Sequence, residues 1–351
     1  MIQTYSSTIR RKEMDAVLTC MVDEKIGPGE MTQRLVSFSR EFFSVDGAVA
    51  LRSPAIALKY AFKALDLPKE SGVILSALAP LWQFQAVEDL GYTPLIVDVA
   101  LDTGLVTEES LEQGIRQGGR VIILSETMGN LPDISAIQSL GIPVIEDISQ
   151  SVGAFRELPG KDETETSVIK KAGTYGTFSI VGLEEKDIVT AGGGALLMAP
   201  GRREWIILKR FAEEAPGTDI LPDLNSALAY IQLKEFVKNE SRRQELFSAF
   251  QKALMTGRHK TFMRTQSGES AVYGFPVVLD SGFKDVKSYA SRKGIEVQQA
   301  FSNTIVSFLD ENLDGCINAK SLFLRTAVFP LYPRLGNSQV TSIIKVLGTL
   351  P

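Results

Sequence analysis

The sequence predicts an α/β fold with a mostly parallel sheet covered by helices on both faces, followed by a smaller α+β unit. Short apolar runs alternate with helical patterns from Ala48 to about Gly176, as in parallel sheets with crossover helices. After Gly176 the pattern changes to adjacent strands and then a long helical region. We therefore expect a large domain over residues 1–235, with an N-terminal helical arm, and a small C-terminal domain over residues 236–351.

The N-terminal arm is predicted from two helical patterns. Met14 to Met21 has apolar residues at helical spacing, and Ile26-Gly27-Pro28-Gly29 is expected to end this helix. Met31 to Phe43 is a second amphipathic segment.

The large domain is predicted from alternating strand and helix candidates. The strand candidates are the short apolar runs 49–51, 72–75, 94–99, 121–124 and 143–145. The helix candidates between them are 55–65, 81–90, 110–117 and 134–140. Thr177 to Ile180 and Gly194 to Met198 are expected to be adjacent strands around a polar loop.

The rest of the chain predicts the second, smaller unit. A long helical region runs from about Asn225 to Leu254. Strand candidates follow at 273–279 and 326–329, and helix candidates at 284–293 and 338–347.

Composition and charge argue against a nucleic-acid-binding protein and against a membrane protein. The chain has 351 residues, 44% of them apolar and 23% charged, which is ordinary for a globular protein. The net charge of −5 gives no reason to expect nucleic acid as a partner, because binding its phosphates needs a basic surface. No signal-peptide pattern and no run of about 18 apolar residues is present, so we expect a cytoplasmic protein with no membrane contact.

The cysteines and the histidine exclude further kinds of site. Cys20 and Cys316 lie far apart without metal-ligand spacing, so the sequence predicts a reducing compartment and no disulfide framework. The single histidine, His259, stands in a polar run that we expect to be an exposed loop. One histidine excludes metal sites built from several imidazoles, and its setting argues against a Ser-His-Asp triad.

Residues 144–155, VIEDISQSVGAF, place an acid at the end of a buried strand. Ligands of open α/β sheets bind beyond the carboxyl ends of the strands, where Asp147 is expected. A buried carboxylate there can hold a cationic ring nitrogen, as aspartate does in proteins that bind pyridoxal phosphate. The alternative is a strand-end aspartate that caps the next turn.

Residues 176–198, GTFSIVGLEEKDIVTAGGGALLM, offer a hydroxyl, a lysine and three glycines. A lysine becomes a Schiff-base nucleophile when burial or a nearby cation lowers its pKa, which makes Lys186 a candidate. Glycines 192–194 would let the backbone approach a ligand closely. The alternative is that Lys186 is an ordinary exposed lysine in a charged loop.

Together the two segments resemble the DegT/StrS family of pyridoxal-phosphate-dependent sugar aminotransferases, which have the aspartate-aminotransferase fold (fold type I). Further segments resemble the family in the same order along nearly the whole chain. They are KIGPGEMTQRLVSFSREFF, LGYTPLIVDVALDTGLVTEESLEQGI, LNSALAYIQLKEFVKNESRRQEL and CINAKSLFLRTAVFPLYPRL.

The resemblance implies pyridoxal 5'-phosphate as cofactor, with Asp147 on the pyridine nitrogen and Gln150 near the phenolic oxygen. It implies Ser179 on the phosphate and Lys186 as the lysine that binds the cofactor covalently. The family's phosphate-binding turn falls on Ser53-Pro54-Ala55, and Trp82 lies two residues from the position of the ring-stacking aromatic. It further implies a keto-sugar substrate, an amino-acid donor and a homodimer.

Five positions depart from the family pattern. Pro54 lacks an N–H and Ala55 a hydroxyl, so two donors to a phosphate are missing. The ring-stacking position is Pro80. The span from Ser179 to Lys186 is two residues longer than usual, and Glu184-Glu185 precede the lysine and favour its ammonium form.

The other two departures lie elsewhere in the chain. The family's Asn-x-Arg falls on Thr218 to Ile220, where Asp219 would repel a phosphate. A histidine common in the family is replaced by Glu126.

Two functions follow. The first is a pyridoxal-phosphate-dependent aminotransferase acting on a keto-sugar, nucleotide-linked, in which Lys186 and Asp147 carry the chemistry. The second is a family member that has lost catalysis and serves as a binding or assembly subunit. The family's dehydratase branch replaces the lysine with histidine, and Lys186 argues against it.

Overall fold

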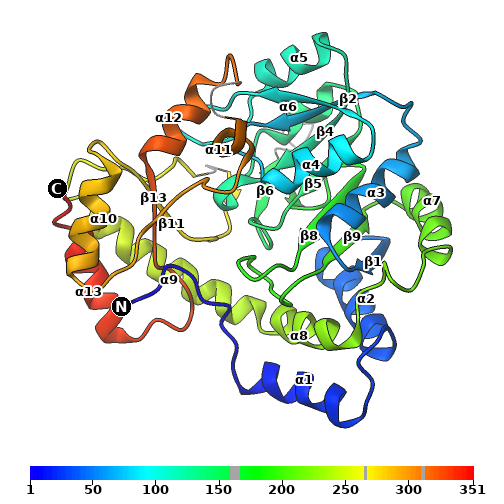
Figure 1. Ribbon diagram of the computed structural model, residues 1–351, viewed down its shortest axis with the longest axis horizontal. Helices are drawn as coiled ribbons and strands as arrows, with labels where there is room; N and C mark the ends of the chain where they lie inside the picture. Colours follow the sequence, from blue (N-terminus) through cyan, green and yellow to red (C-terminus); the bar gives the residue numbers. More distant parts are fainter. Residues whose placement is uncertain (159–166, 265–266, 310–312) are drawn as a thin grey trace.

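A central seven-stranded sheet organises the computed structural model, which describes residues 1–158, 167–264, 267–309 and 313–351 (Figure 1). The strands lie in the order β1-β9-β8-β5-β4-β2-β3. The pairs from β8 to β3 are parallel, and β9 is antiparallel to both β8 and β1. The strands are β1 (Gly47–Leu51), β2 (Gly72–Ser76), β3 (Thr93–Val97), β4 (Gly119–Ser125), β5 (Val144–Asp147), β8 (Phe178–Gly182) and β9 (Ala195–Ala199). The predicted mostly parallel α/β architecture is confirmed.

Helices cover both faces of this sheet because consecutive residues of most strands are buried, so that both faces need cover. In β4, Val121 and Ile123 pack toward one face, and Ile122 and Leu124 pack toward the other. One face is covered by α3 (Pro54–Leu65), α4 (Leu81–Asp89) and α7 (Arg202–Glu213). The other is covered by α2 (Glu30–Phe43), α5 (Glu108–Arg116), α6 (Ile134–Ser139) and α8 (Asp223–Lys234), with α1 (Arg11–Val22) on α8.

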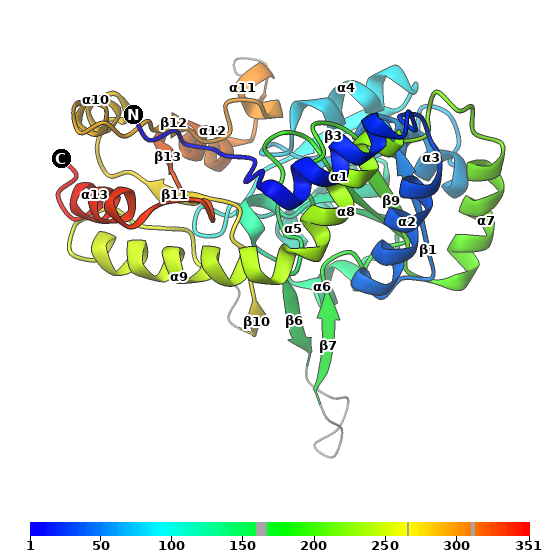
Figure 2. The same cartoon turned by 90° about the horizontal axis from the view of Figure 1, so that it is seen from below.

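The C-terminal part has its own sheet and core. Strand β13 (Thr326–Phe329) pairs with β11 (Phe275–Val278) and β12 (Gln298–Gln299). Helices α9 (Phe236–Leu254), α10 (Phe283–Arg292) and α13 (Asn337–Leu347) pack around it, and α11 (Ile305–Leu309) and α12 (Ile317–Arg325) lie between it and the large sheet (Figures 1 and 2).

The helical region expected from Asn225 to Leu254 is two helices. The backbone of Glu235 (φ −90°, ψ 1°) leaves the helical range, so α8 ends and α9 begins there. The first residues of the chain lie against the C-terminal part, since Ile2 exchanges backbone hydrogen bonds with Gly294 and Glu296. A division into two domains at residue 235 stays a prediction.

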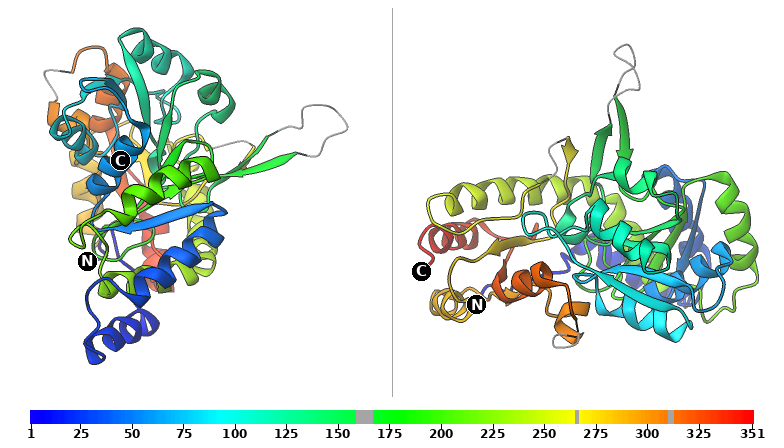
Figure 3. Two further views of the ribbon diagram at one scale, coloured as in Figure 1. Left: turned by 90° about the vertical axis from the view of Figure 1, so that its right-hand side faces the viewer. Right: turned by 90° about the horizontal axis from the view of Figure 1, so that it is seen from above.

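A ribbon of two strands, which the sequence did not predict, projects from the body of the molecule (Figures 2 and 3). Strand β6 (Phe155–Leu158) pairs with β7 (Val168–Lys171), and β10 (Gly268–Glu269) adds to its edge. The strands are short and mix apolar with charged residues, so they carry no clear period. Val168 and Ile169 are more than half exposed on the ribbon.

The prediction that His259 lies in an exposed loop is wrong, because its side chain is buried under the C-terminus. Its ring bonds to the carbonyl of Pro351 through Nε2, and Nδ1 accepts the N–H of Asp280. Both ring nitrogens are therefore occupied by backbone groups. No helix within the described ranges is long and apolar enough to span a membrane.

Asp98, just after β3, joins the large sheet to α12. Its carboxylate accepts the N–H groups of Asn318 and Ala319 at distances of 3.0 and 2.9 Å, in the first turn of that helix. An anion at this end is also favoured by the helix dipole.

We predict that Asp98→Ala lowers the free energy of unfolding by about 1–2 kcal/mol, because two N–H groups lose their acceptor. Urea unfolding followed by circular dichroism measures the change. Asp102→Ala, at an exposed aspartate four residues on, is the control and is expected to have little effect. An equal loss in both variants would contradict a capping role.

Candidate active site

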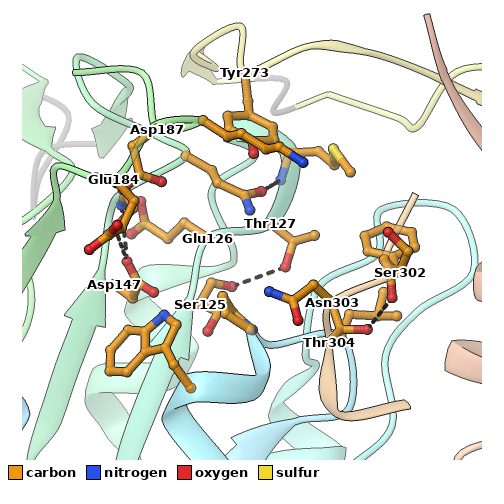
Figure 4. Close-up of a pocket in the computed structure, with 18 of the residues that line it drawn as sticks. Ser125, Glu126, Thr127, Asp147, Glu184, Asp187, Tyr273, Ser302, Asn303 and Thr304 are labelled. Carbon is orange, nitrogen blue, oxygen red and sulfur yellow. Dashed lines mark hydrogen bonds between the residues drawn. The ribbon is translucent and has the colours of Figure 1, made fainter. Parts of the chain in front are cut away.

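A cavity of about 420 Å³ opens beyond the carboxyl ends of β4 and β5, where α/β sheets bind ligands (Figure 4). Its walls come from the starts of α3 and α4, the segment after β4, the hairpin between β8 and β9, and residues 298–304 of the C-terminal part. Among the described residues, its charged lining consists of one lysine and five carboxyl groups. These are Lys186, Glu126, Asp147, Glu184, Glu185 and Asp187.

Asp147 is the last residue of β5 and is 5% exposed. Its Oδ2 accepts a hydrogen bond from Nε2 of Gln83 at 2.7 Å. Its Oδ1 accepts hydrogen bonds from the backbone N–H and the hydroxyl of Ser149. Burial raises the pKa of this carboxyl, and the bonds from Ser149 and Gln83 oppose the rise. No described lysine or arginine pairs with it, so a cation entering the cavity finds an acceptor whose charge is not neutralised.

Glu146 points to the opposite face of the sheet. Its carboxylate accepts the N–H groups of Gly173, Tyr175 and Gly176. Burial raises its pKa to about 7, although these three bonds lower it. Glu126 lies beside it, and burial followed by the charge of Glu146 raises the pKa of Glu126 as well. Two adjacent buried carboxyl groups cannot both ionise easily, so the pair holds a proton.

Gln150 and Trp82 both line the cavity, and so does Pro80, the position that the resemblance gives to the ring-stacking aromatic. The Oε1 atom of Gln150 accepts the N–H of Met128 at 2.8 Å, which fixes the amide in the cavity wall. Trp82 stands in the first turn of α4, one residue before the Gln83 that bonds Asp147. The indole therefore lines the same cavity as the carboxylate of Asp147.

Lys186 lines the same cavity as Asp147, but its side chain is largely exposed. Its Nζ lies 5.1 Å from the centre of the Tyr5 ring, a cation–π contact. Asp187 lies deeper, where its carboxylate accepts the N–H of Glu184 at 2.8 Å. Burial raises the pKa of Asp187, and Figure 4 places it and Glu184 on the same side of the cavity as Asp147.

The structure does not bring Ser179 to the cavity, which corrects the expectation that it holds a phosphate there. In the parallel pairing of β5 and β8, Ser179 is opposite Glu146, and Ile180 is opposite Asp147. Paired residues point to the same face of a sheet, so Ser179 points away from Asp147. Its hydroxyl is fully buried and donates to the carbonyl of Gly173 at 2.9 Å.

Ser53 and Ala55 are not among the residues that line the cavity, whereas Pro54 between them is. The hydroxyl of Ser53 caps α3 by accepting the N–H of Ile56 at 3.2 Å. Ala55 packs against the apolar core under α3. This turn therefore starts a helix at the cavity without the donors that the resemblance implied.

A neutral polar wall, which sequence reasoning missed, faces the carboxyl groups. It is formed by Gln298, Gln299, Ser302, Asn303 and Thr304 of the C-terminal part. Figure 4 shows the amide of Asn303 pointing into the cavity. The carbonyl of Asn303 accepts the N–H of Leu81 at 3.1 Å, which anchors the wall to the start of α4. The only signal in the sequence was the polar run 302–304, which resembles any loop.

Comparison with known proteins decides the family. The model of the DegT/DnrJ/EryC1/StrS aminotransferase family matches residues 7–348. The chain belongs to this family. The resemblance inferred from its sequence is therefore confirmed.

Similar solved structures support the same architecture. The aminotransferase TlmJ from Streptoalloteichus hindustanus is 18% identical with a TM-score of 0.86, and the match covers 99% of this chain and 98% of that one. The PLP form of the putative sugar aminotransferase Spr1654 from Streptococcus pneumoniae is 16% identical, with a TM-score of 0.86 and coverage of 98% and 97%. E. coli GDP-4-keto-6-deoxy-D-mannose-3-dehydratase with bound hydrated PLP is 17% identical, with a TM-score of 0.82 and 99% coverage of both chains.

Pyridoxal phosphate is the cofactor of this family. Its ring fits the residues of this cavity, because Asp147 offers an acceptor to a pyridinium nitrogen and Trp82 offers a flat apolar surface. Its phosphate fits less well. Pro54 has no N–H, Ser179 points away, and five carboxyl groups face the cavity.

The acid pair generates a prediction for stability against pH. The pKa of Glu146 is about 7 when folded and near 4.5 when unfolded, so the folded state binds more protons between these values. Its stabilising effect is full below the lower value and is lost as the pH rises through about 7.

The pKa of Glu126 is also raised, by burial and then by the charge of Glu146, so we predict that Glu126→Gln, which removes this second titrating carboxyl, flattens the fall in stability between about pH 5 and 7.5. Urea midpoints measured at both pH values give the slope. Glu109→Gln, at an exposed glutamate of α5, is the control. An unchanged slope in Glu126→Gln would show that the pair does not share a proton.

Proposed function

We propose that this chain is a pyridoxal-phosphate-dependent aminotransferase that acts on a keto-sugar, nucleotide-linked, with an amino acid as donor. The observation that carries the proposal is the buried, cation-free carboxyl of Asp147, which faces a cavity also lined by Trp82, Gln150 and Lys186. Family membership supports the reaction class, and the sugar aminotransferases among the similar structures support the substrate class.

The cofactor, when bound, supplies an electron sink for proton removal beside the amino group. In the proposed site, Asp147 would hold the ring nitrogen and favour its positive charge, and Gln83 and Ser149 keep that carboxyl in place. Lys186, whose amine lies over the ring of Tyr5, would be the amine that holds the cofactor and moves the proton. The neutral polar wall at 302–304 suits sugar hydroxyls, because amides and hydroxyls both donate and accept.

A second candidate is a family member that binds its ligand without turnover. The poor fit of the phosphate favours it, as does the exposure of Lys186. Measured amino transfer to any keto-sugar from glutamate would exclude this second candidate.

The test of the proposed function is the absorbance of the cofactor. Protein mixed with pyridoxal phosphate is expected to show a visible band of lysine-bound cofactor, and Lys186→Ala is expected to abolish it, because no other described amine lines the cavity. Lys234→Ala is a matched control, since Lys234 also lies 5.1 Å from a tyrosine ring centre, that of Tyr230. A band that survives in Lys186→Ala, or none at saturating cofactor, would contradict the assignment.

We also propose that the chain acts as a cytoplasmic homodimer. Its support is apolar surface in two places: Val168 and Ile169 on the ribbon of β6 and β7, and Met14, Leu18 and Met21 in a row on α1. These three residues of α1 are each more than half exposed and recur at helical spacing on its outer face.

Light scattering after gel filtration is expected to give twice the mass of one chain. Ile169→Asp is expected to weaken the dimer by at least about tenfold, because a charge would be buried at the contact. Ile206→Asp changes an isoleucine of similar exposure on α7 and is expected to leave the dimer intact. Equal behaviour of the two variants would exclude the ribbon as the contact.

A further inference from the structure

The start of α3 points at the cavity but offers it few donors. The first N–H groups of a helix are free to bind an anion, and the N-terminus carries a partial positive charge. In α3 the first position is Pro54, which has no N–H and is the only one of residues 53–55 to line the cavity. The third N–H, that of Ile56, is already bonded to the hydroxyl of Ser53.

The charge around the cavity opposes a phosphate as well. Lys186 is the only lysine or arginine among the described residues that line it, and the proposed function assigns its amine to the carbonyl carbon. Lys59, one turn into α3, is paired with Asp219 at 3.1 Å, and Tyr60 donates to the same carboxylate at 2.8 Å. The nearest cation on α3 is thus already neutralised.

Around Asp147 the cavity retains the groups that would bind the ring of the cofactor, whereas the start of α3 lacks donors for its phosphate. The two ends of the cofactor would therefore lie in different environments. Asp147 is held by Gln83 and Ser149 and lines the cavity, with acceptor capacity left on Oδ2. A ligand with a cationic ring or ammonium group gains from the carboxyl groups there, and a dianionic phosphate is repelled by them.

We infer that this site selects the ring of the cofactor and not its phosphate, so that it binds phosphorylated and unphosphorylated forms about equally. This inference rests on the proposed function and concerns how the same site distinguishes its ligands. We assign the lost preference for phosphate to Pro54, which lines the cavity and has no N–H, and to Ala55 beside it, which supplies no hydroxyl to the helix start.

The test compares pyridoxamine phosphate with pyridoxamine, which differ only in the phosphate and carry no aldehyde to react with surface lysines. The chain has two tryptophans, Trp82 in the cavity and Trp205 on α7, so a Trp205→Phe background leaves Trp82 as the reporter. Fluorescence titration gives both dissociation constants without any turnover. We expect them to agree within about threefold, because a single charge-assisted bond to phosphate already changes affinity by about tenfold or more.

The cause is tested by restoring donors. Pro54→Gly with Ala55→Thr, in the same background, returns one N–H and one hydroxyl to the start of α3. We expect affinity for pyridoxamine phosphate to rise at least about tenfold and affinity for pyridoxamine to stay within about twofold. Pro68→Gly, at an exposed proline beyond the end of α3, controls for loss of proline alone. Thermal melting of each variant confirms that it folds.

The outcomes are distinct. Pyridoxamine phosphate binding ten or more times tighter than pyridoxamine in the Trp205→Phe protein would overturn the inference and leave the proposed function standing. Binding of neither ligand would overturn the proposed function, and the inference with it. A double variant that folds and raises the affinity of neither ligand, or of both equally, would overturn the role assigned to Pro54 and Ala55.

Discussion

Two adjacent carboxyl groups at the end of β5, which pair with no lysine or arginine in the described part of the chain, constrain the segments around them. Desolvating a carboxylate is costly, so each must be supplied with hydrogen bonds by the surrounding chain. Glu146 is supplied by three backbone N–H groups of the turn at 173–176, and Asp147 by Gln83 of α4 and by Ser149. The turn before β8, the start of α4 and the segment after β5 are therefore positioned by what these two acids need.

The two acids differ because neighbouring residues of a strand face opposite sides of the sheet. Glu146 faces the side of α2 and α6, where its bonds are complete and its partner is Glu126. Asp147 faces the cavity on the side of α3 and α4. Only Asp147 can therefore contact a ligand in the cavity. Glu146 instead holds the turn at residues 173–176 against the sheet.

The same alternation explains what the sequence could predict and what it could not. Apolar runs located the central strands and helices to within a few residues, because burial on both faces leaves a strong pattern. Asp147 was found because an acid directly after such a run must lie at the ligand edge. The role of Ser179 was wrong because a serine's face depends on register with the neighbouring strand, and register is a property of the folded sheet.

The burial of His259 and the polar wall of the cavity could not be predicted either, because both depend on contacts between segments that are distant in sequence. His259 stands in a polar run, yet the C-terminus, about ninety residues away in sequence, covers its ring. The neutral wall at Ser302 and Asn303 becomes part of the site only because its backbone is tied to the segment between β2 and α4. Asn303 accepts the N–H of Leu81, and the neighbouring Ile305 donates its N–H to the carbonyl of Ala79. Such contacts between distant segments leave no local pattern to find.

Fold and site respond differently to sequence change in this family, and the chain shows why. At 16–18% identity the architecture persists over nearly the full length, because it depends on the spacing of apolar residues, which many substitutions preserve. A phosphate site depends instead on a few donors, and one proline at the first position of α3 removes an N–H without disturbing the helix, whose first position suits proline. The helix start can therefore change its ligand while α3, its core and the sheet beneath remain as they are.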